Sequence, residues 1–241
     1  MAVNQNSRIV IIGGTSGLGL ATAQAAAAAG AEVVIGSRRP ESVERALAEL
    51  PPTASGFAVD ASSDDSLARF FASAGPFDHF AYTAAENLSA VPIGDYRPET
   101  GAALFGLRVV HALNAVRHAV ERARPGGSLT LISGSAAWRG GAGWTLGAAA
   151  SGAMVSAVRS LAVELAPIRV NAVAPGVVRS PLWGAMDERE REAMYAQLGA
   201  ALPLGRVGEV GDVAKAFLSL MDQDWVTGTV SVVDGGTLVA P

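Results

Sequence analysis

The chain has 241 residues, a length that fits one large α/β domain better than two. Half of its residues are hydrophobic and only 17% are charged, which excludes disorder and predicts extensive burial, including at a subunit interface. The net charge of −4 leaves no basic excess to hold a nucleic acid backbone. The lack of cysteine excludes disulfides, iron–sulfur clusters, cysteine-bound zinc and thiol nucleophiles.

The alternation of apolar segments predicts both the strands and the helices. Seven short apolar runs are expected to be strands, at residues 8–12, 32–35, 56–59, 77–83, 128–132, 168–173 and 229–233. Helices are expected between and after them, at residues 18–29, 40–50, 63–72, 98–122, 145–165, 187–198 and 210–221. This alternation predicts a seven-stranded parallel sheet covered on both faces, in a single doubly wound Rossmann-type domain.

Two uncharged stretches, residues 9–31 and 140–158, are long enough to be considered as membrane spans. Both are rich in glycine, alanine and serine, which contribute little insertion free energy, and glycines divide the first stretch into a strand and a helix. Residues 1–7 show no basic region followed by an apolar core, so no signal peptide is expected. We therefore expect a cytoplasmic protein without a membrane partner.

Histidines give no support for a metal site. His111 and His118 lie seven residues apart on one expected helix, too far for a single ion to bridge easily, and no acidic cluster accompanies them. We interpret both as solvated or interface side chains, with His111 at a subunit contact rather than in a pocket.

A glycine-rich turn follows the first expected strand, in residues 9–19 (IVIIGGTSGLG). Glycines there permit a tight turn and let backbone N–H groups approach a pyrophosphate, while the dipole of the following helix favours the anion. Thr15 and Ser16 add hydroxyl donors. The alternative is a turn that needs glycine for its conformation alone.

The spacing of this turn resembles that of the short-chain dehydrogenase/reductase family, which reads TGxxxGxG, with Ile12 where the family usually has threonine. Asp60 and Ala61 resemble the family's Asp-Val pair beside the adenine ring. Residues 169–181 (RVNAVAPGVVRSP) resemble its RVNxVxPGxxxTP segment, and residues 226–236 its C-terminal signature. The resemblance covers nearly the whole chain and implies a nicotinamide-dependent oxidoreductase that acts on a carbonyl or an alcohol.

The end of the second strand bears on which dinucleotide binds. A carboxylate there would select NAD, but the chain has Ser37, Arg38 and Arg39, which can hold a 2′-phosphate and stack on adenine. We infer NADP(H); the alternative is a solvated turn, and Ser16 stands where many NADP-binding relatives carry a basic residue. The expected cofactor contacts are Gly13, Thr15, Ser16, Gly17, Leu18, Gly19, Ser37, Arg38, Arg39, Asp60, Ala61, Ala84, Ala85, Pro175, Gly176, Val178 and Ser180.

The resemblance fails at the catalytic centre. The family uses a serine, a Tyr-x3-Lys pair and an asparagine, in which the lysine lowers the pKa of the phenol that delivers the proton. Aligning residues 149–154 with the family pattern puts Ala148 at the tyrosine, Gly152 at the lysine and Ala103 at the asparagine, and leaves Ser135 as the single remaining catalytic residue.

No shift of register restores the pair, since Lys215 is the one lysine in the chain and no tyrosine lies between Tyr96 and Tyr195. A positioned general acid contributes about 10²–10⁴-fold, so its loss would cripple the usual reaction without abolishing hydride transfer. The candidate replacements are Tyr82, Tyr195, Glu86 and Arg139, and for each the alternative is packing or a solvated face.

We therefore expect an NADP(H)-dependent oxidoreductase with a non-standard acid–base arrangement. Residues 181–203 form an expected lid, whose Leu182, Trp183 and Met186 indicate a small apolar substrate. The alternatives are a catalytically silent NADP-binding protein, as a sensor or a subunit of a mixed oligomer, and a lyase or isomerase reaction in the same pocket. The small side chains of Ala148 and Gly152, and the packing of the same helices in family dimers, predict a homodimer or homotetramer.

Overall fold

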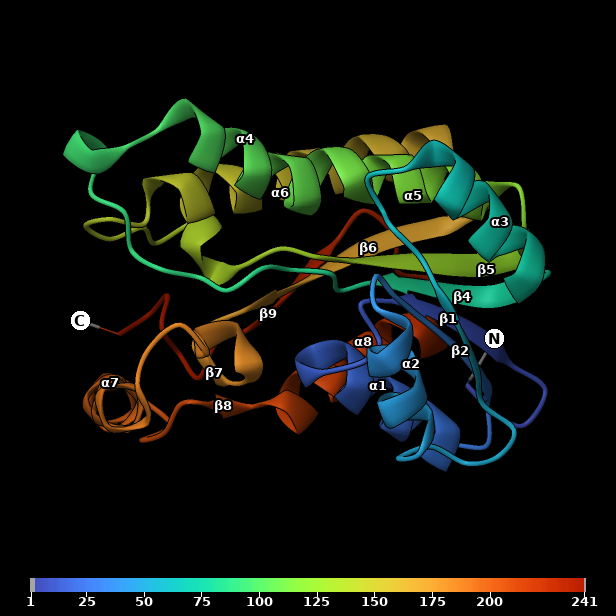
Figure 1. The fold of residues 1–241 in the computed structure, drawn as a ribbon, viewed down its shortest axis with the longest axis horizontal. Helices are drawn as coiled ribbons and strands as arrows, with labels where there is room; N and C mark the ends of the chain where they lie inside the picture. Colours follow the sequence, from blue (N-terminus) through green and yellow to red (C-terminus); the bar gives the residue numbers. More distant parts are fainter. Residues whose placement is uncertain (1–2, 241) are drawn as a thin grey trace.

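Seven parallel strands form the central sheet of the computed structural model, which describes residues 3–240 (Figure 1). Neighbouring strands follow the order β3-β2-β1-β4-β5-β6-β9, and every pair is parallel. This confirms the predicted doubly wound fold. The strands are β1 (Arg8–Ile12), β2 (Glu32–Ser37), β3 (Ser55–Ala58), β4 (Phe77–Tyr82), β5 (Ala123–Ile132), β6 (Arg169–Pro175) and β9 (Val230–Val233).

Helices cover both faces of the sheet, as Figure 1 shows, and each face has its own hydrophobic core. Successive side chains of a strand point to opposite faces, so Val10 and Ile12 pack beneath α3, α5 and α6 while Ile9 and Ile11 pack against α1, α2 and α8. The helices are α1 (Gly17–Ala28), α2 (Pro40–Leu47), α3 (Asp64–Ala74), α4 (Pro98–Phe105), α5 (His111–Val120), α6 (Thr145–Glu164), α7 (Glu188–Ala201) and α8 (Val210–Asp222).

The strand order reverses direction at β1, whose neighbours are β2 on one side and β4 on the other. Chain connections leave β1 and β4 toward opposite faces, so a crevice opens at their carboxyl ends. This topology fixes where a ligand site can form before any side chain is considered.

The single helix predicted over residues 98–122 is wrong in one respect. A π-helical turn (Gly106–Val110) separates α4 from α5, so the side chains beyond Phe105 are rotated relative to a regular helix. The sequence also gave no sign of the two-stranded sheet of β7 (Val178–Arg179) and β8 (Gly208–Glu209). This small sheet lies beside α7 (Figure 1).

Neither uncharged stretch forms an isolated span. Residues 9–31 divide into β1, the glycine turn and α1, as predicted. Among the described residues, α6 is one helix that is long and apolar enough to cross a membrane by length and composition alone. Met154 and Val158 of α6 pack into the core over the sheet, whereas Val163 near its C-terminal end is 81% exposed.

Candidate cofactor and substrate site

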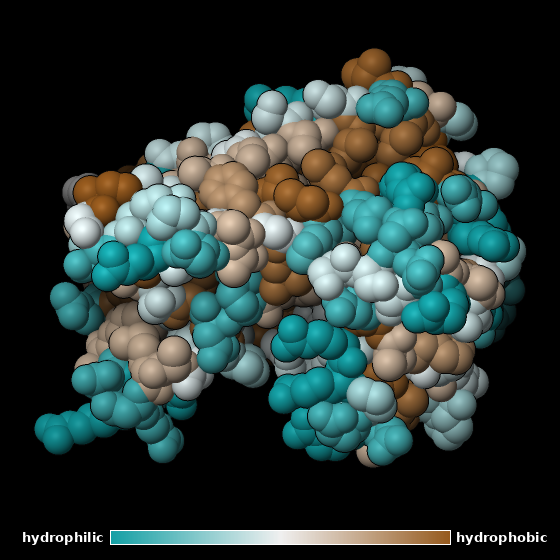
Figure 2. Space-filling model, turned by 45° about the horizontal axis from the view of Figure 1, so that its top comes forward, coloured by the Kyte–Doolittle hydropathy of each residue, from teal (hydrophilic) through white to brown (hydrophobic). Residues whose placement is uncertain are grey.

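A cavity of about 1770 Å³ runs along the carboxyl ends of the strands, from β2 to α7. In Figure 2 the surface is hollowed between the lobe that holds α7 and the lobe that holds α1 and α2. Of the seventeen expected cofactor contacts, all but Gly19 line this cavity. The fold therefore brings together residues that lie as far apart in the chain as Gly13 and Ser180.

The glycine turn has the conformation that an anion cradle requires. Gly13 and Gly17 have positive φ angles of 89° and 51°. Ser16 is the N-cap of α1 but makes no side-chain capping bond, and the first turn of α1 has no acidic side chain. The N–H groups at the start of α1 are thus left for a ligand, and the helix dipole favours a negative one.

Gly19 corrects the expectation that it contacts the cofactor. A Cβ built on Gly19 would lie 2.2 Å from the carbonyl oxygen of Gly13 and 2.5 Å from Oγ1 of Thr83. Its lack of a side chain lets α1 pack directly on the turn and on the segment after β4. Gly19 therefore shapes the cradle without lining it.

At the far end of the cavity, Ser37 ends β2 and is followed by the exposed Arg38 and Arg39. Asp60 faces them, and hydrogen bonds from the hydroxyl and N–H of Ser62, together with the charge of Arg38, lower its pKa. The ionised Asp60 can accept from a ribose or adenine group, and the two arginines can meet a phosphate.

His111 also lines the cavity, on the side of Asp60, which corrects its expected place at a subunit contact. His118 is buried, not solvated: its Nε2 lies 2.8 Å from Oδ1 of Asp64, and its ring stacks on Phe71. Within residues 3–240, no group of three histidine or acidic side chains could hold a metal ion.

Opposite the glycine turn, the N-terminal half of α6 borders the cavity, with Gly147 and Ser151 in its wall. Ala148 and Gly152, which align with the family's tyrosine and lysine, each follow one of these residues. A Cβ built on Gly140 of the cavity wall would lie 3.8 Å from Cβ of Ala148, and a Cβ built on Gly152 would meet no atom within 4 Å. Neither position carries a group that could donate a proton.

Ser135 lines the cavity and is largely buried at the start of a short 3₁₀ turn (Ser135–Ala137). A Cβ built on Gly134 would lie 3.0 Å from Oγ of Ser151. Ala103 lines the cavity as expected, so no amide group replaces the asparagine.

Two of the four suggested proton donors are held away from the cavity. Tyr82 is fully buried, its hydroxyl donates to the carbonyl oxygen of Leu107, and burial raises its pKa far above the usual range. Tyr195 is also buried, with the guanidinium of Arg179 at 4.5 Å from its ring centroid. Neither phenol lines the cavity, so for both candidates the structure favours the alternative, packing.

The other two candidates, Glu86 and Arg139, do line the cavity. Arg139 donates from Nη1 to the carbonyl oxygens of Thr237 and Ala240, which ties the C-terminal segment to the pocket loop. Glu86 accepts from Nε of Arg108 at 3.1 Å. The sequence gave no sign of this ion pair, because Arg108 reaches the cavity from the π-helical turn.

The lid expected at residues 181–203 is built from a short 3₁₀ turn (Pro181–Trp183) and α7. Its buried contacts join Trp183, Tyr195 and Val207, with Trp144 packed against them. The indole ring of Trp183 meets that of Trp144 edge to face, with centroids 5.8 Å apart. An aromatic and aliphatic wall thus closes the cavity on the side away from the glycine turn.

Comparison with known proteins agrees with this architecture. The family model described as enoyl-(acyl carrier protein) reductase matches residues 13–237. Short-chain dehydrogenase/reductase ATR9 of Stachybotrys chlorohalonatus is 34% identical over 99% of this chain and all of its own length. The chain therefore belongs to the short-chain dehydrogenase/reductase family.

Solved structures of full-length relatives superpose on the whole fold. A small-chain dehydrogenase in complex with NADPH has a TM-score of 0.85 and 31% identity, over 97% of this chain and 99% of its own. The MalC reductase/Diels-Alderase from Malbranchea aurantiaca has a TM-score of 0.91 and 27% identity, over 98% of both chains. The members of this family are oxidoreductases that bind nicotinamide cofactors, and the chain is of this type.

Proposed function

We propose that the protein is an NADP(H)-dependent oxidoreductase that acts on a carbonyl-type bond of a small apolar substrate, without the usual acid–base relay. The observation that carries this proposal is the continuous cavity, which joins the glycine turn and the Ser37–Arg39 corner to an aromatic lid. A related structure of the same length is a complex with NADPH, which supports the choice of cofactor.

The chain's own residues fit such a cofactor. The first N–H groups of α1 would bind the pyrophosphate, Ser37, Arg38 and Arg39 the 2′-phosphate, and Asp60 the adenosine end. Bound NADPH supplies a hydride. The buried contacts of Trp183 and Trp144 would exclude water from the place where that hydride is delivered.

The direct test is a titration of the purified protein with NADPH and with NADH, followed by cofactor fluorescence and by calorimetry. We expect saturable NADPH binding at micromolar concentration and NADH binding about tenfold or more weaker. Absence of binding with both nucleotides would overturn the proposal.

A catalytically silent NADP-binding protein is the second candidate. The observation that favours it is the loss of the family's asparagine, tyrosine and lysine, which are replaced by Ala103, Ala148 and Gly152. Tight NADPH binding without turnover on a broad panel of carbonyls and alcohols would support it. Co-purification with a relative that has the Tyr-x3-Lys pair would identify it as the silent subunit of a mixed oligomer.

A third candidate is another reaction in the same cavity, such as lyase or isomerase chemistry. One related structure is named both a reductase and a Diels-Alderase, so that neighbour combines reduction with a second activity. Turnover without oxidation of NADPH would favour this candidate.

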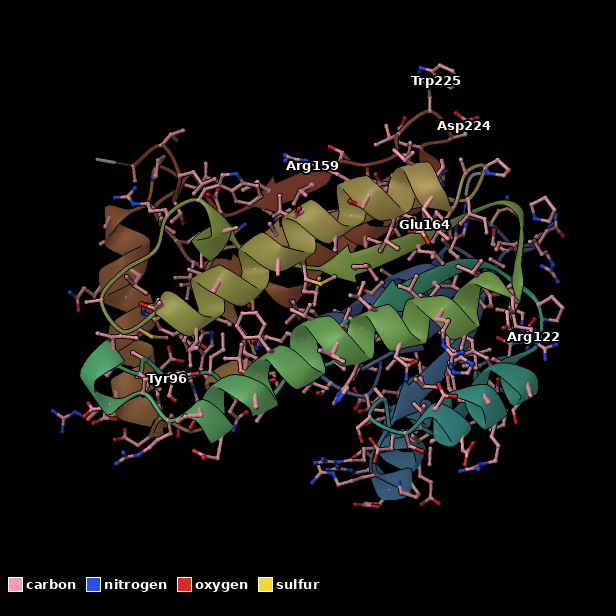
Figure 3. The ribbon with its side chains drawn as sticks, turned by 90° about the horizontal axis from the view of Figure 1, so that it is seen from above. Tyr96, Arg122, Arg159, Glu164, Asp224 and Trp225 are labelled. Atoms are coloured by element: carbon pink, nitrogen blue, oxygen red, sulfur yellow. The ribbon has the colours of Figure 1, made fainter. Side chains whose placement is uncertain are left out.

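We also propose a homodimer or homotetramer in the cytoplasm. Apolar side chains gather on the upper face of the molecule, over α5 and α6 (Figure 2). Val110 is 59% exposed and Val163 is 81% exposed on this face. In Figure 3 α6 lies beside the α4–α5 segment, so one partner could cover both. The cytoplasmic assignment rests on the absence of cysteine from the sequence.

A further inference from the structure

Four charged side chains line the substrate half of the cavity: Glu86, Arg108, Arg139 and Glu190. Glu86 follows β4, Arg108 comes from the π-helical turn, Arg139 from the pocket loop and Glu190 from α7. Their formal charges sum to zero. The two arginines are hydrogen-bonded to protein oxygen atoms, however, whereas the two carboxylates keep oxygen atoms without a partner among the described residues, and this difference indicates the charge of the ligand that the cavity can bind.

Both arginines are already engaged with oxygen atoms. Arg108 donates from Nε to Oε1 of Glu86 at 3.1 Å and from Nη2 to the carbonyl oxygen of Glu86 at 3.4 Å. Its side chain is only 15% exposed, so it is held against the wall. Arg139 is bound to the two C-terminal carbonyl oxygens described above.

The two carboxylates keep acceptor capacity. Oε2 of Glu86 is enclosed and has no hydrogen-bond partner, although the side chain as a whole remains 35% exposed in the cavity wall. The carboxylate of Glu190 makes no ion pair with any described residue. A ligand in the cavity would meet Glu86 through the exposed 35% of its side chain, where the negative charge favours a cation or an N–H group.

The remaining wall suits a cation that has an apolar body. Trp144 and Trp183 contribute aromatic rings, and Met186 and Met194 contribute polarisable thioethers. An aromatic face attracts a positive charge, and the attraction is largest where water is excluded. A weakly hydrated organic cation therefore gains from this wall as well as from the carboxylates.

We propose that the hydride acceptor is an iminium ion, a C=N⁺ group on an apolar ring system, with Glu86 as the residue that selects its charge. This inference rests on the proposed function, which supplies NADPH. Hydride adds to the iminium carbon, the electron pair of the C=N π bond becomes the nitrogen lone pair, and the products are a neutral amine and NADP⁺. No proton is consumed, so the missing phenol and ammonium groups are not needed.

The charge change explains why this acceptor fits better than a carbonyl. Reduction of a carbonyl creates an oxyanion, which the carboxylate of Glu86 would repel and for which the described cavity wall holds no phenol as proton donor. Reduction of an iminium ion moves the substrate from positive to neutral. The loss of the Tyr-x3-Lys pair therefore slows carbonyl reduction but not iminium reduction. The carboxylate of Glu86 disfavours the product of the first reaction and favours the substrate of the second.

The first experiment compares two bicyclic acceptors of similar size: N-methyl-3,4-dihydroisoquinolinium, which is a permanent cation, and 1-tetralone, which is a neutral ketone. With the wild-type protein and NADPH, we expect the iminium ion to be reduced at a kcat/KM about 100-fold or more above that of the ketone. Its rate should be the same in H₂O and in D₂O, because no solvent proton enters the step. Equal or preferred reduction of the ketone would overturn the inference.

The second experiment measures binding without turnover. The fluorescence of Trp144 and Trp183 would report binding of N-methyl-1,2,3,4-tetrahydroisoquinoline, the protonated amine, and of tetralin, its neutral hydrocarbon counterpart. Glu86→Gln keeps an oxygen for Arg108 but removes the charge, and should weaken amine binding about tenfold or more while tetralin binding is unchanged. Glu99→Gln, the same substitution on the exposed start of α4 outside the cavity, should change neither.

The experiments distinguish a failure of the proposed cofactor from a failure of the proposed iminium acceptor. If NADPH does not bind, the proposed function is wrong, whereas the amine titration still tests the charge preference of the cavity. If NADPH binds to the wild-type protein and to Glu86→Gln alike, both variants are folded. An unchanged amine affinity in Glu86→Gln would then overturn the assignment of Glu86.

Discussion

At the scale of single residues, the cavity differs from that of an ordinary family member by a few side chains. Ala148 and Gly152 stand where the family pattern has a phenol and an ammonium group. A Cβ at Gly152 would meet no atom within 4 Å. The backbone there has room for a side chain, so the absence of the relay is a matter of sequence and not of fold.

Restoring the relay is the first prediction at this scale. Ala148→Tyr combined with Gly152→Lys should raise ketone reduction by about 10²-fold or more, because the ammonium group lowers the pKa of the phenol and Ser135 already lines the cavity. Steady-state kinetics with 1-tetralone would measure it. The matched control is Gly147→Tyr with Ser151→Lys, which carries the same side chains one position earlier on the helix and should show no comparable gain.

A second prediction concerns the end of β2. Ser37→Asp would place a carboxylate against the expected 2′-phosphate, so NADPH affinity should fall about tenfold or more and NADH affinity should rise. Titration of one preparation with both nucleotides measures the ratio directly, and NADH serves as the control for folding. A parallel loss of both affinities would instead mean that the variant is misfolded or that Ser37 lies away from the cofactor.

At the scale of secondary-structure elements, polar contacts join elements that sequence patterns treat as independent. The π-helical turn directs Arg108 to Glu86, and His118 of α5 meets Asp64 at the start of α3. Hydrogen bonds from Arg117 and His118 lower the pKa of Asp64 to about 2. Inside the sheet, His79 of β4 bonds to the hydroxyl of Ser128 on β5 at 2.9 Å.

The histidine in the sheet leads to a prediction about pH. Burial, reinforced by the charge of Arg169, lowers the pKa of His79 from 6.5 to about 4. The unfolded chain therefore binds a proton at a higher pH than the folded chain, so the stability present above about pH 6.5 is lost as the pH falls toward 4. The loss should be about 2–3 kcal/mol, since each pKa unit corresponds to about 1.4 kcal/mol.

Denaturant unfolding at pH 7.0 and at pH 4.5 would measure this loss. In His79→Leu, which fills the same buried site without a titratable group, the free energy of unfolding should fall less between the two pH values than in the wild-type protein. Equal falls in both proteins would assign the acid sensitivity to other groups.

At the scale of the whole molecule, the apolar face over α5 and α6 remains without a partner in a single chain. Val110 and Leu113 are 59% and 37% exposed there, in a chain of low charge content. Trp225 projects from the loop before β9 and is 96% exposed (Figure 3). Apolar area of this kind is stabilised when a second copy covers it.

The prediction at this scale is that the purified protein is a dimer or tetramer by light scattering after gel filtration. Val110→Glu should shift the population toward smaller species, because it places a charge in the covered face. Ile93→Glu changes an equally exposed apolar residue on the short 3₁₀ turn (Ile93–Asp95), away from α5 and α6, and should leave the assembly unchanged. A monomeric wild-type protein would contradict the prediction.

The sequence by itself was enough to predict the doubly wound fold, the glycine turn and nearly all of the residues that line the cofactor half of the cavity. It also showed that the Tyr-x3-Lys pair is absent. Period-two and period-3.6 patterns and local turn chemistry act over a few residues, so they can be seen in the chain without a fold. Gly13, Ser37 and Asp60 could be named for this reason, and all three line the cavity.

Only the tertiary structure decided that Tyr82 and Tyr195 are buried away from the cavity, that His111 lines it, and that Glu86 pairs with Arg108. Packing between elements fixes which side chains reach the cavity, and no short stretch of sequence records that packing. The π-helical turn depends on the same packing, and nothing in the local sequence of residues 106–110 distinguishes it from a regular helix. Contacts between residues far apart in the chain are set by the fold as a whole. The sequence therefore predicted which segments line the cavity, but not which of their side chains contact one another there.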